Sequence, residues 1–207
     1  MKYIEFVKVD AGDGLPETQF PLRNGPADPM PGITIAWWEI DEVGVPHYFG
    51  TAPDKVSTEV PGVLRLIAAE EWDNLVVLRR RAAQESIDTT AGLVRVQFVS
   101  AGQFIEQEYR LAQEEVAAWR AAGSRAESAP DSVSSGAEYA NLSIEQAAVE
   151  IEQSAQAWTD ALLQIRNLRL AGKRMVRDCV PEAITSTLQS SIDQLQALAT
   201  QMAVPTA

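Results

Sequence analysis

The residues that most often carry out chemistry are scarce in this sequence of 207 residues. It holds one histidine, His47, and one cysteine, Cys179. A Ser–His–acid triad would depend on His47, which stands between Pro46 and Tyr48 in an apolar stretch, and a packed or surface histidine is the simpler interpretation. Cys179 has no second histidine to activate it, so we expect a buried and inert thiol. Neither residue predicts a nucleophilic site.

The remaining polar residues do not predict a metal, cofactor or acid–base site. A structural zinc ion usually takes four Cys or His ligands, more than this chain can supply. Asp10 and Asp13 loosely match a calcium loop, but the alternating ligands and the closing glutamate are missing. Glu70–Glu71 and Glu114–Glu115 are adjacent pairs on expected helices, so their carboxylates diverge. Phosphate-binding glycine loops, dinucleotide fingerprints and nucleophile elbows are absent from the sequence. We therefore expect no enzyme, no metal and no cofactor.

The charge of the chain also narrows its partners. A formal net charge of −12 argues against general affinity for nucleic acid or anionic lipid. Arg79–Arg80–Arg81 suits the dipole at the end of its expected helix, with a nucleic-acid role as the alternative. A basic stripe is read as salt-bridging and solvated surface, with a phosphate grip as the alternative, and it comprises Arg166, Arg169, Lys173 and Arg177. No stretch has the roughly 20 apolar residues of a membrane span, and the N-terminus lacks a signal-peptide pattern. We expect a protein that stays in the cytoplasm or is carried out in an assembly.

The first third of the chain predicts a small antiparallel β module. Apolar and β-branched runs at residues 2–9, 33–41, 46–50 and 63–67 are typical of short strands, and a loop rich in proline and glycine separates the first two. Trp37 and Trp38 are adjacent, so they must point to opposite faces of a strand. We interpret one as core and the other as covered by the loop. The alternative is an aromatic contact patch of Trp37, Trp38, Tyr48 and Phe49.

Helical patterns dominate the rest of the chain. We expect a helix near 68–86, a strand at 92–99 that joins the sheet, and a capping box at Ser100 and Gln103 that opens a second helix. That helix should bury one face and stop at Gly123, and residues 124–140, rich in Ser and Ala, are read as a loop. The predicted modules are therefore a β-rich part, 1–100, and a helical part, 101–207, with a break at Pro181.

An apolar seven-residue repeat runs from Asn141 to Met202 and predicts association between helices. Such a repeat places large side chains on one narrow stripe that must be buried against another helix. Acidic residues come first in the segment before Pro181 and basic residues last, which favours an antiparallel or staggered neighbour over a parallel one in register. The predicted oligomer or partner contacts are Ile151, Trp158, Ile165, Ile184, Leu188, Leu195, Leu198 and Met202. An internal hairpin that hides the residues up to Ile165 would leave the segment after Pro181 as the better oligomer contact.

The helical region resembles a module of tailed-bacteriophage tail proteins, in which a "GQ…Y…E" helix, a short loop and a long "A…W…I…R.AGK" helix follow a small β-rich head. The resemblance covers about residues 93 to 178, and the β-rich head is similar only in general. This chain departs by a longer Ser-rich insert and by the repeat after Pro181. The residues that carry it are Gly102-Gln103, Tyr109, Glu114, Ala122-Gly123, Ala147-Ala148, Ile151, Ala155, Trp158, Ile165, Arg169 and Gly172-Lys173.

Together these observations predict an α+β protein, a small antiparallel β-rich module followed by long helices in a hairpin or coiled coil. The resemblance implies a structural component of a phage tail, in the baseplate or tail-fibre region. Such a component binds other tail proteins and is located in the virion after assembly in the host cytoplasm. It carries over no catalytic residue. We expect a homo-oligomer, with a trimer favoured. The rival functions are a tail-fibre assembly chaperone that binds the fibre tip, and a small enzyme or nucleotide binder with an unrecognised pocket.

Overall fold

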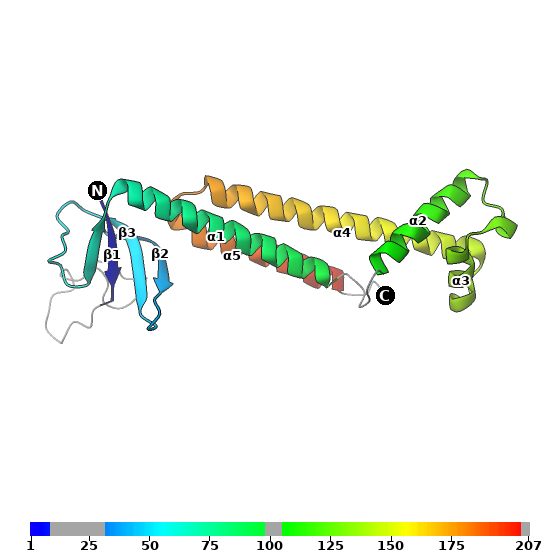
Figure 1. Ribbon diagram of the computed structural model, residues 1–207, viewed down its shortest axis with the longest axis horizontal. Helices are drawn as coiled ribbons and strands as arrows, with labels where there is room; N and C mark the ends of the chain where they lie inside the picture. The colour runs from blue at the N-terminus through cyan, green and yellow to red at the C-terminus, as the bar shows by residue number, and fades with distance from the viewer. Residues whose placement is uncertain (9–31, 98–104, 204–207) are drawn as a thin grey trace. The chain divides into compact units, whose positions relative to one another are not determined.

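The computed structural model describes residues 1–8, 32–97 and 105–203, and shows a four-stranded antiparallel sheet followed by long helices (Figure 1). The α+β prediction is confirmed. The chain forms two compact units. Unit 1 comprises Met1–Asp88 and Leu170–Asp193, and unit 2 comprises Thr89–Arg169 and Gln194–Ala207. This division replaces the predicted boundary at residue 100, because both α4 (Ile144–Asp178) and α5 (Ile184–Ala203) contribute to each unit.

The sheet of unit 1 contains the four strands expected from the sequence. They are β1 (Lys2–Val7), β2 (Thr34–Ile40), β3 (Pro46–Ala52) and β4 (Val63–Ile67), in the spatial order β2-β3-β1-β4. The register of β2 against β3 shifts between Ile35 and Trp37. A Cβ atom on Gly50 would lie 2.2 Å from the carbonyl oxygen of Thr34, so only glycine allows β2 to approach this closely.

Each face of the sheet has its own apolar layer. One layer is a core cluster built from Ile4, Phe6, Ile33, Tyr48, Ala52, Val56 and Val63. The opposite face packs against helix α1 (Ala69–Val96), where Trp72 stacks on Tyr3 at 4.6 Å between ring centroids and lies 4.9 Å from Trp37. Because side chains alternate between the two faces of each strand, both faces of the sheet contribute to a core. We call this sheet, with the residues packed on its two faces, the head.

Helix α1 extends well past the predicted end at residue 86. The predicted strand at 92–99 is wrong, because residues 92–96 belong to this helix. Ala83, Ile87, Ala91 and Val94 are all buried, at steps of four, four and three residues. A helical period therefore outweighs the local alternation of Val94 and Val96 that suggested a strand. The predicted capping box at Ser100 and Gln103 lies outside the described residues.

In unit 1, the end of α4 and the start of α5 pack beside α1. Arg80 Nη2 donates a hydrogen bond to the carbonyl oxygen of Cys179 at 2.7 Å, and Gln84 Nε2 donates to that of Lys173 at 3.3 Å. The bond to Cys179 gives a partner to a carbonyl just past the C-terminal end of α4, and the bond to Lys173 adds a second link between α1 and α4. Helix α4 continues through Gly172 as one helix. The break falls at Pro181, which opens the short 3₁₀ helix η3 (Pro181–Ala183), and η3 lies against β2.

Unit 2 contains a small helical cluster at the start of α4. Helix α2 (Ile105–Ala121) ends before Gly123, whose φ of +98° is the left-handed stop that the sequence predicted. The segment 124–140 is not the loop that we expected, because it forms η2 (Ala126–Ser128) and helix α3 (Asp131–Ala140). Serine and alanine are compatible with a helix once an apolar face is buried. The cluster that buries it comprises Val116, Trp119, Val133, Ala137, Ala147 and Ala148.

Candidate association surfaces

The predicted aromatic contact patch does not exist as a surface. Trp37, Tyr48 and Phe49 are 3%, 5% and 7% exposed, and Trp37 stacks on Phe49 with 5.3 Å between the ring centroids. Only Trp38, at 47% exposure, remains available to a partner. The structure thus confirms that one tryptophan of the tandem is core, and it corrects the alternative that grouped all four residues as contacts.

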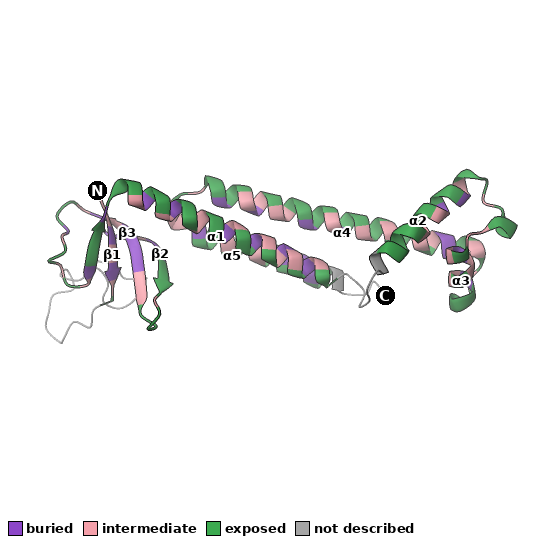
Figure 2. Ribbon diagram, in the orientation of Figure 1, coloured by how far each residue is buried: buried purple, intermediate pink, exposed green. Residues whose placement is uncertain are grey.

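Four of the eight predicted helical contacts are buried within the chain. Ile165, Ile184 and Leu195 are fully buried, and Leu198 is 7% exposed. In Figure 2 buried and exposed residues are interspersed along the long helices. Leu188 is half-buried, and the side chain of Met202 lies outside the described residues. The preference for the segment after Pro181 as the oligomer contact is therefore wrong for Ile184, Leu195 and Leu198. The physical reason is that α5 turns back after Pro181 and lays its apolar stripe against this chain's own helices.

Besides Leu188, two of the predicted contacts keep part of their surface. Ile151 and Trp158 of α4 are half-buried, as are Ala155 and Leu162 beside them. Ile151 packs against the cluster around Val116 and Trp119. Tyr109, which we expected on the buried face of α2, is 61% exposed. The expected internal hairpin thus closes at the C-terminal end of α2 and leaves part of the α4 stripe open.

An exposed apolar turn was missed from the sequence. Residues 40–45 form the turn between β2 and β3, and we call this turn the hairpin tip. Its Ile40, Val43 and Val45 are 61%, 82% and 41% exposed. The carboxylate of Asp41 accepts hydrogen bonds from the backbone amides of Val43 at 3.0 Å and Val45 at 2.7 Å. Gly44 supplies the positive φ of +87°. The signal was present in the sequence as an Asp-x-x-Gly turn flanked by aliphatic residues, which has the chemistry of an Asx turn.

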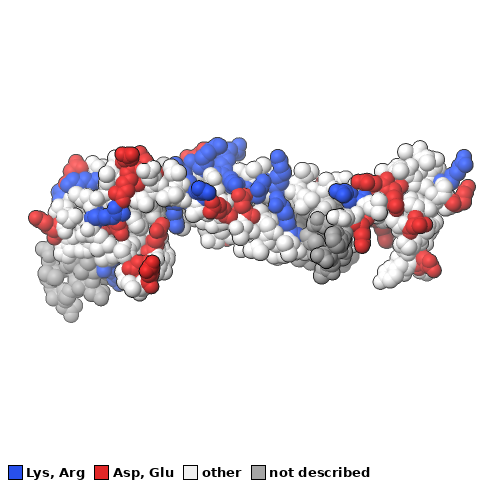
Figure 3. Space-filling model, in the orientation of Figure 1, with Lys and Arg blue, Asp and Glu red and all other residues white. Residues whose placement is uncertain are grey.

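The hairpin tip is connected to the sheet by a cluster of charged side chains. His47 Nδ1 lies 2.8 Å from Glu5 Oε1, and its Nε2 lies 3.2 Å from Asp41 Oδ2. Arg65 Nε donates to Glu5 Oε2 at 2.5 Å, and its Nη1 donates to Glu71 in the first turn of α1. On the face shown in Figure 3, acidic and basic side chains are mixed over the head. Charges of opposite sign that alternate in this way hold elements together without creating a field of one sign.

The pKa values within this cluster move in opposite directions. The hydrogen bond to Glu5 raises the pKa of His47; burial lowers it, and the bond to Asp41 raises it further. Burial tends to raise the pKa of Glu5, but the bonds from His47 and Arg65 outweigh it, and the net shift is downward. The backbone amide of Val45 is the main cause of a lowered pKa at Asp41. Each shift favours the charged form.

A second charged cluster fastens the helices of unit 2. Arg120 of α2 donates to Glu145 at 2.7 Å and to Glu152 at 3.0 and 3.2 Å. The hydrogen bonds to Glu145 and Glu152 raise the pKa of Arg120, and Arg120 lowers the pKa of Glu145. The guanidinium also lies 5.1 Å from the ring centroid of Trp119. Arg120 therefore links α2 to the first two turns of α4.

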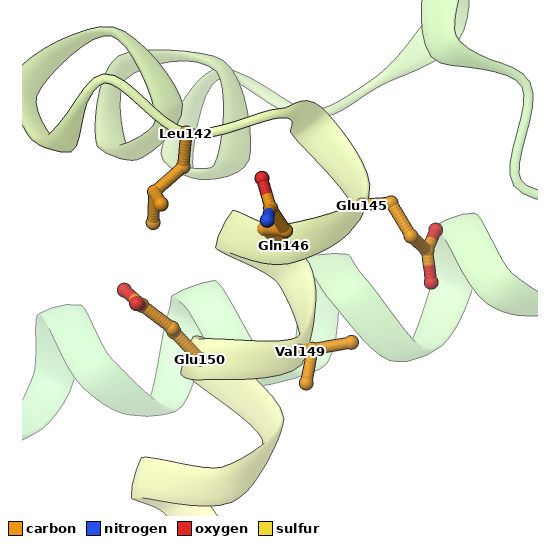
Figure 4. A pocket seen from close by; sticks show the side chains of 5 residues that line it. All are labelled: Leu142, Glu145, Gln146, Val149 and Glu150. Carbon is orange, nitrogen blue, oxygen red and sulfur yellow. The ribbon is translucent and has the colours of Figure 1, made fainter.

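The geometry of these groups does not assemble a reaction centre in the described part of the chain. The two ring nitrogens of His47 point in opposite directions, so Glu5 and Asp41 cannot converge on one ion. Within the described ranges, no group of three or more His, Cys, Asp or Glu side chains is placed to hold a metal. Asp10 and Asp13, whose loose match to a calcium loop was set aside in the sequence analysis, lie outside those ranges. A shallow hollow lined by Leu142, Glu145, Gln146, Val149 and Glu150 is open to solvent, and its two carboxylates point away from each other (Figure 4).

Comparison with known proteins adds no relative. No family model matches the sequence, and no curated protein or solved structure matches the chain. Among the described helices, none combines the length and the apolarity that crossing a bilayer requires.

Proposed function

We propose that this chain is a structural protein of a bacteriophage tail, in the baseplate or tail-fibre region, and that it acts through protein–protein association. The observation that carries the proposal is the resemblance over residues 93–178, which implies a small β-rich head followed by long helices. The described fold has a head and helices of this kind. Exposed apolar side chains among the described residues, such as Val43 at 82%, support a role in association.

The head has a surface suited to one partner. The hairpin tip presents three exposed aliphatic side chains on a turn that Asp41 fixes before any partner binds. A preformed turn loses little conformational entropy on binding, so its apolar area contributes more fully to affinity. We infer that the hairpin tip inserts into an apolar pocket of a neighbouring tail protein.

The location in the tail is tested by mass spectrometry of purified particles of the phage or prophage that encodes the chain. Tailed particles should contain this chain at a fixed ratio to the other tail proteins. Tail-free heads from the same lysate are the control and should lack it. Absence from the tailed particles would overturn the proposal and would favour the tail-fibre assembly chaperone, for which the net charge of −12 is also suitable.

The role of the hairpin tip is tested separately with matched variants. Val43→Asp places a charge at a position that is 82% exposed, and Val77→Asp does the same at a 60% exposed position of α1 in the same unit. Neither change should alter the melting temperature of the purified chain appreciably. Incorporation into particles should fall with Val43→Asp and persist with Val77→Asp. Equal incorporation of both would show that the hairpin tip is not the docking surface.

A further inference from the structure

A central stretch of α4 in unit 2 is covered less completely than its two ends. Ala147 and Ala148 are buried at one end, Ala161 and Ile165 at the other, and no residue from 149 to 160 is buried. This gap extends for roughly 18 Å at 1.5 Å per residue. Its apolar residues, Ile151, Ala155 and Trp158, continue with Leu162 as one stripe, and all four are half-buried. We call these four residues the open stripe.

One edge of the open stripe carries charges in a defined order. Glu145, Glu152, Thr159 and Arg166 recur every seven residues, and each follows an apolar residue of the repeat by one position. Residues spaced by seven lie on one line along a helix, so this column is acidic before Thr159 and basic after it. A second helix with the same column would match these charges only if it ran in the opposite direction.

The sizes of the side chains in the open stripe favour the same direction. In an antiparallel pair, each layer combines two different positions of the repeat, so Ala155 of one helix meets Trp158 of the other and Ile151 meets Leu162. A small residue then faces the largest one, which fills space evenly. A parallel pair in register would put two tryptophans in one layer and two alanines in another.

We propose that a second copy of this chain covers the open stripe, with its α4 running antiparallel to the first. In this register Glu145 of each copy lies beside Arg166 of the other, and Glu152 lies beside Thr159. Glu145 already accepts a hydrogen bond from Arg120 of its own chain at 2.7 Å, so Arg166 would be its second cation. Exposed pairs of this kind contribute little affinity and mainly set direction. The charge column thus keeps the antiparallel direction that the sequence favoured, and a two-fold pair takes the place of the expected trimer.

This inference rests on the proposed function only in that the chain works by association, and it does not depend on a place in a phage tail. The open stripe covers about three helical turns and is smaller than a standard protein interface, so we expect a pair that dissociates on dilution. If disulfide trapping finds no pair, mass spectrometry can still find the chain in tailed particles. If the chain is absent from tailed particles, the pair can still form in solution.

Disulfide trapping tests the direction directly. Cys179 is the only cysteine, so Cys179→Ser provides a background without thiols. Ile151→Cys and Leu162→Cys are then prepared separately, and they are oxidised alone and as an equal mixture. The antiparallel pair predicts several-fold more disulfide-linked dimer in the mixture than in either variant alone. Tyr139→Cys, at a position that is 95% exposed on α3, measures random collision. Self-linking of Ile151→Cys or Leu162→Cys to the same yield as the mixture would overturn the proposal in favour of a parallel arrangement.

Exposed positions give a second measurement that does not disturb packing. In the antiparallel pair Thr159 lies beside Glu152 of the other copy, whereas a parallel pair places the two columns on opposite sides. An equal mixture of Thr159→Cys and Glu152→Cys should therefore be linked by a short bismaleimide. Adding Arg166→Glu to both variants should reduce that yield several-fold, because Glu145 would then face a carboxylate. A yield no higher than that of Tyr139→Cys would exclude the pair.

Discussion

The apolar repeat is buried to different extents on the two sides of Pro181. In α5, Ile184 and Leu195 are fully buried, whereas Ile151 and Trp158 of α4 keep part of their surface. The spacing and the residue types are alike, so the repeat indicates only that a helix will cover the stripe. Which helix does so depends on where the chain turns, and the turn at η3 places α5 against its own chain. A repeat that has been covered in this way is no longer available to a partner.

A carboxylate placed in the apolar stripe of α5 or of α4 should give the largest difference in the free energy of unfolding. Leu195→Asp puts a carboxylate at a fully buried position, and we expect a loss of at least roughly 4 kcal/mol in the free energy of unfolding, from the lost packing and the buried charge. Trp158→Asp acts at a half-buried position and should cost roughly 1 to 3 kcal/mol while abolishing the disulfide-trapped pair. Urea unfolding followed by circular dichroism measures both free energies.

This result would also correct an expectation drawn from the sequence alone. If the segment after Pro181 were the oligomer contact, the double change Leu188→Asp with Leu195→Asp would separate subunits and leave the fold intact. Because Leu195 is inside the chain, we now expect loss of structure in the part of α5 that belongs to unit 2. A Leu195→Asp chain that remains folded and becomes monomeric would show that α5 packs against another copy after all.

The head offers the same contrast between two adjacent residues of one type. Trp37→Ala removes a side chain that is 3% exposed and stacked on Phe49, and should cost roughly 3 to 5 kcal/mol. Trp38→Ala removes a side chain that is 47% exposed and should cost about 1 kcal/mol or less. Denaturant melts of the two variants measure the difference. Similar losses from both would mean that Trp38 also belongs to a core.

Close packing between α4 and α5 is tested by two glycines in helices. A Cβ on Gly172 would lie 2.8 Å from Ser191 Oγ and 2.9 Å from its Cβ, whereas one on Gly136 of α3 would meet nothing within 4 Å. Gly172→Ala should therefore destabilise the chain by roughly 1 to 3 kcal/mol through overpacking. Gly136→Ala should stabilise it by roughly 0.5 to 1 kcal/mol, since alanine loses less entropy in a helix. Opposite signs in thermal melts would confirm that α4 and α5 are in contact at Gly172.

These contrasts show what sequence reasoning can and cannot recover. The four strands, the glycine stop at Gly123 and the break at Pro181 follow from local rules, which depend on neighbours in the chain. The helical residues 92–96 were missed because a few residues satisfy both a strand and a helix pattern. Helix α3 was missed because its Ser- and Ala-rich sequence was read as a loop. The sequence could not predict which helix covers each apolar stripe, because Leu195 and Trp158 differ in their tertiary surroundings rather than in their sequence pattern.

The polar clusters provide the smallest but most specific comparison. Arg120 and His47 each bridge two carboxylates, yet an arginine stays charged at every pH of interest while a histidine does not. Because the folded pKa of His47 lies above its ordinary value of 6.5, its contribution to stability is complete below pH 6.5 and is lost as the pH rises through the folded pKa. The folded pKa of Glu5 lies below its ordinary 4.5, so its contribution is present above pH 4.5 and is lost as the pH falls through the folded value.

The His47 cluster should therefore stabilise the head most between about pH 4.5 and 6.5. We expect the free energy of unfolding to fall by on the order of 1 kcal/mol or less above that window, the range of partly exposed ion pairs. His47→Gln should remove this fall, because glutamine can donate a hydrogen bond to Glu5 but does not titrate. Arg120→Lys is the control and should leave the pH dependence unchanged, since lysine stays charged throughout that range. A pH profile that His47→Gln does not alter would assign the slope to other groups and leave His47 as a neutral link between β1 and the hairpin tip.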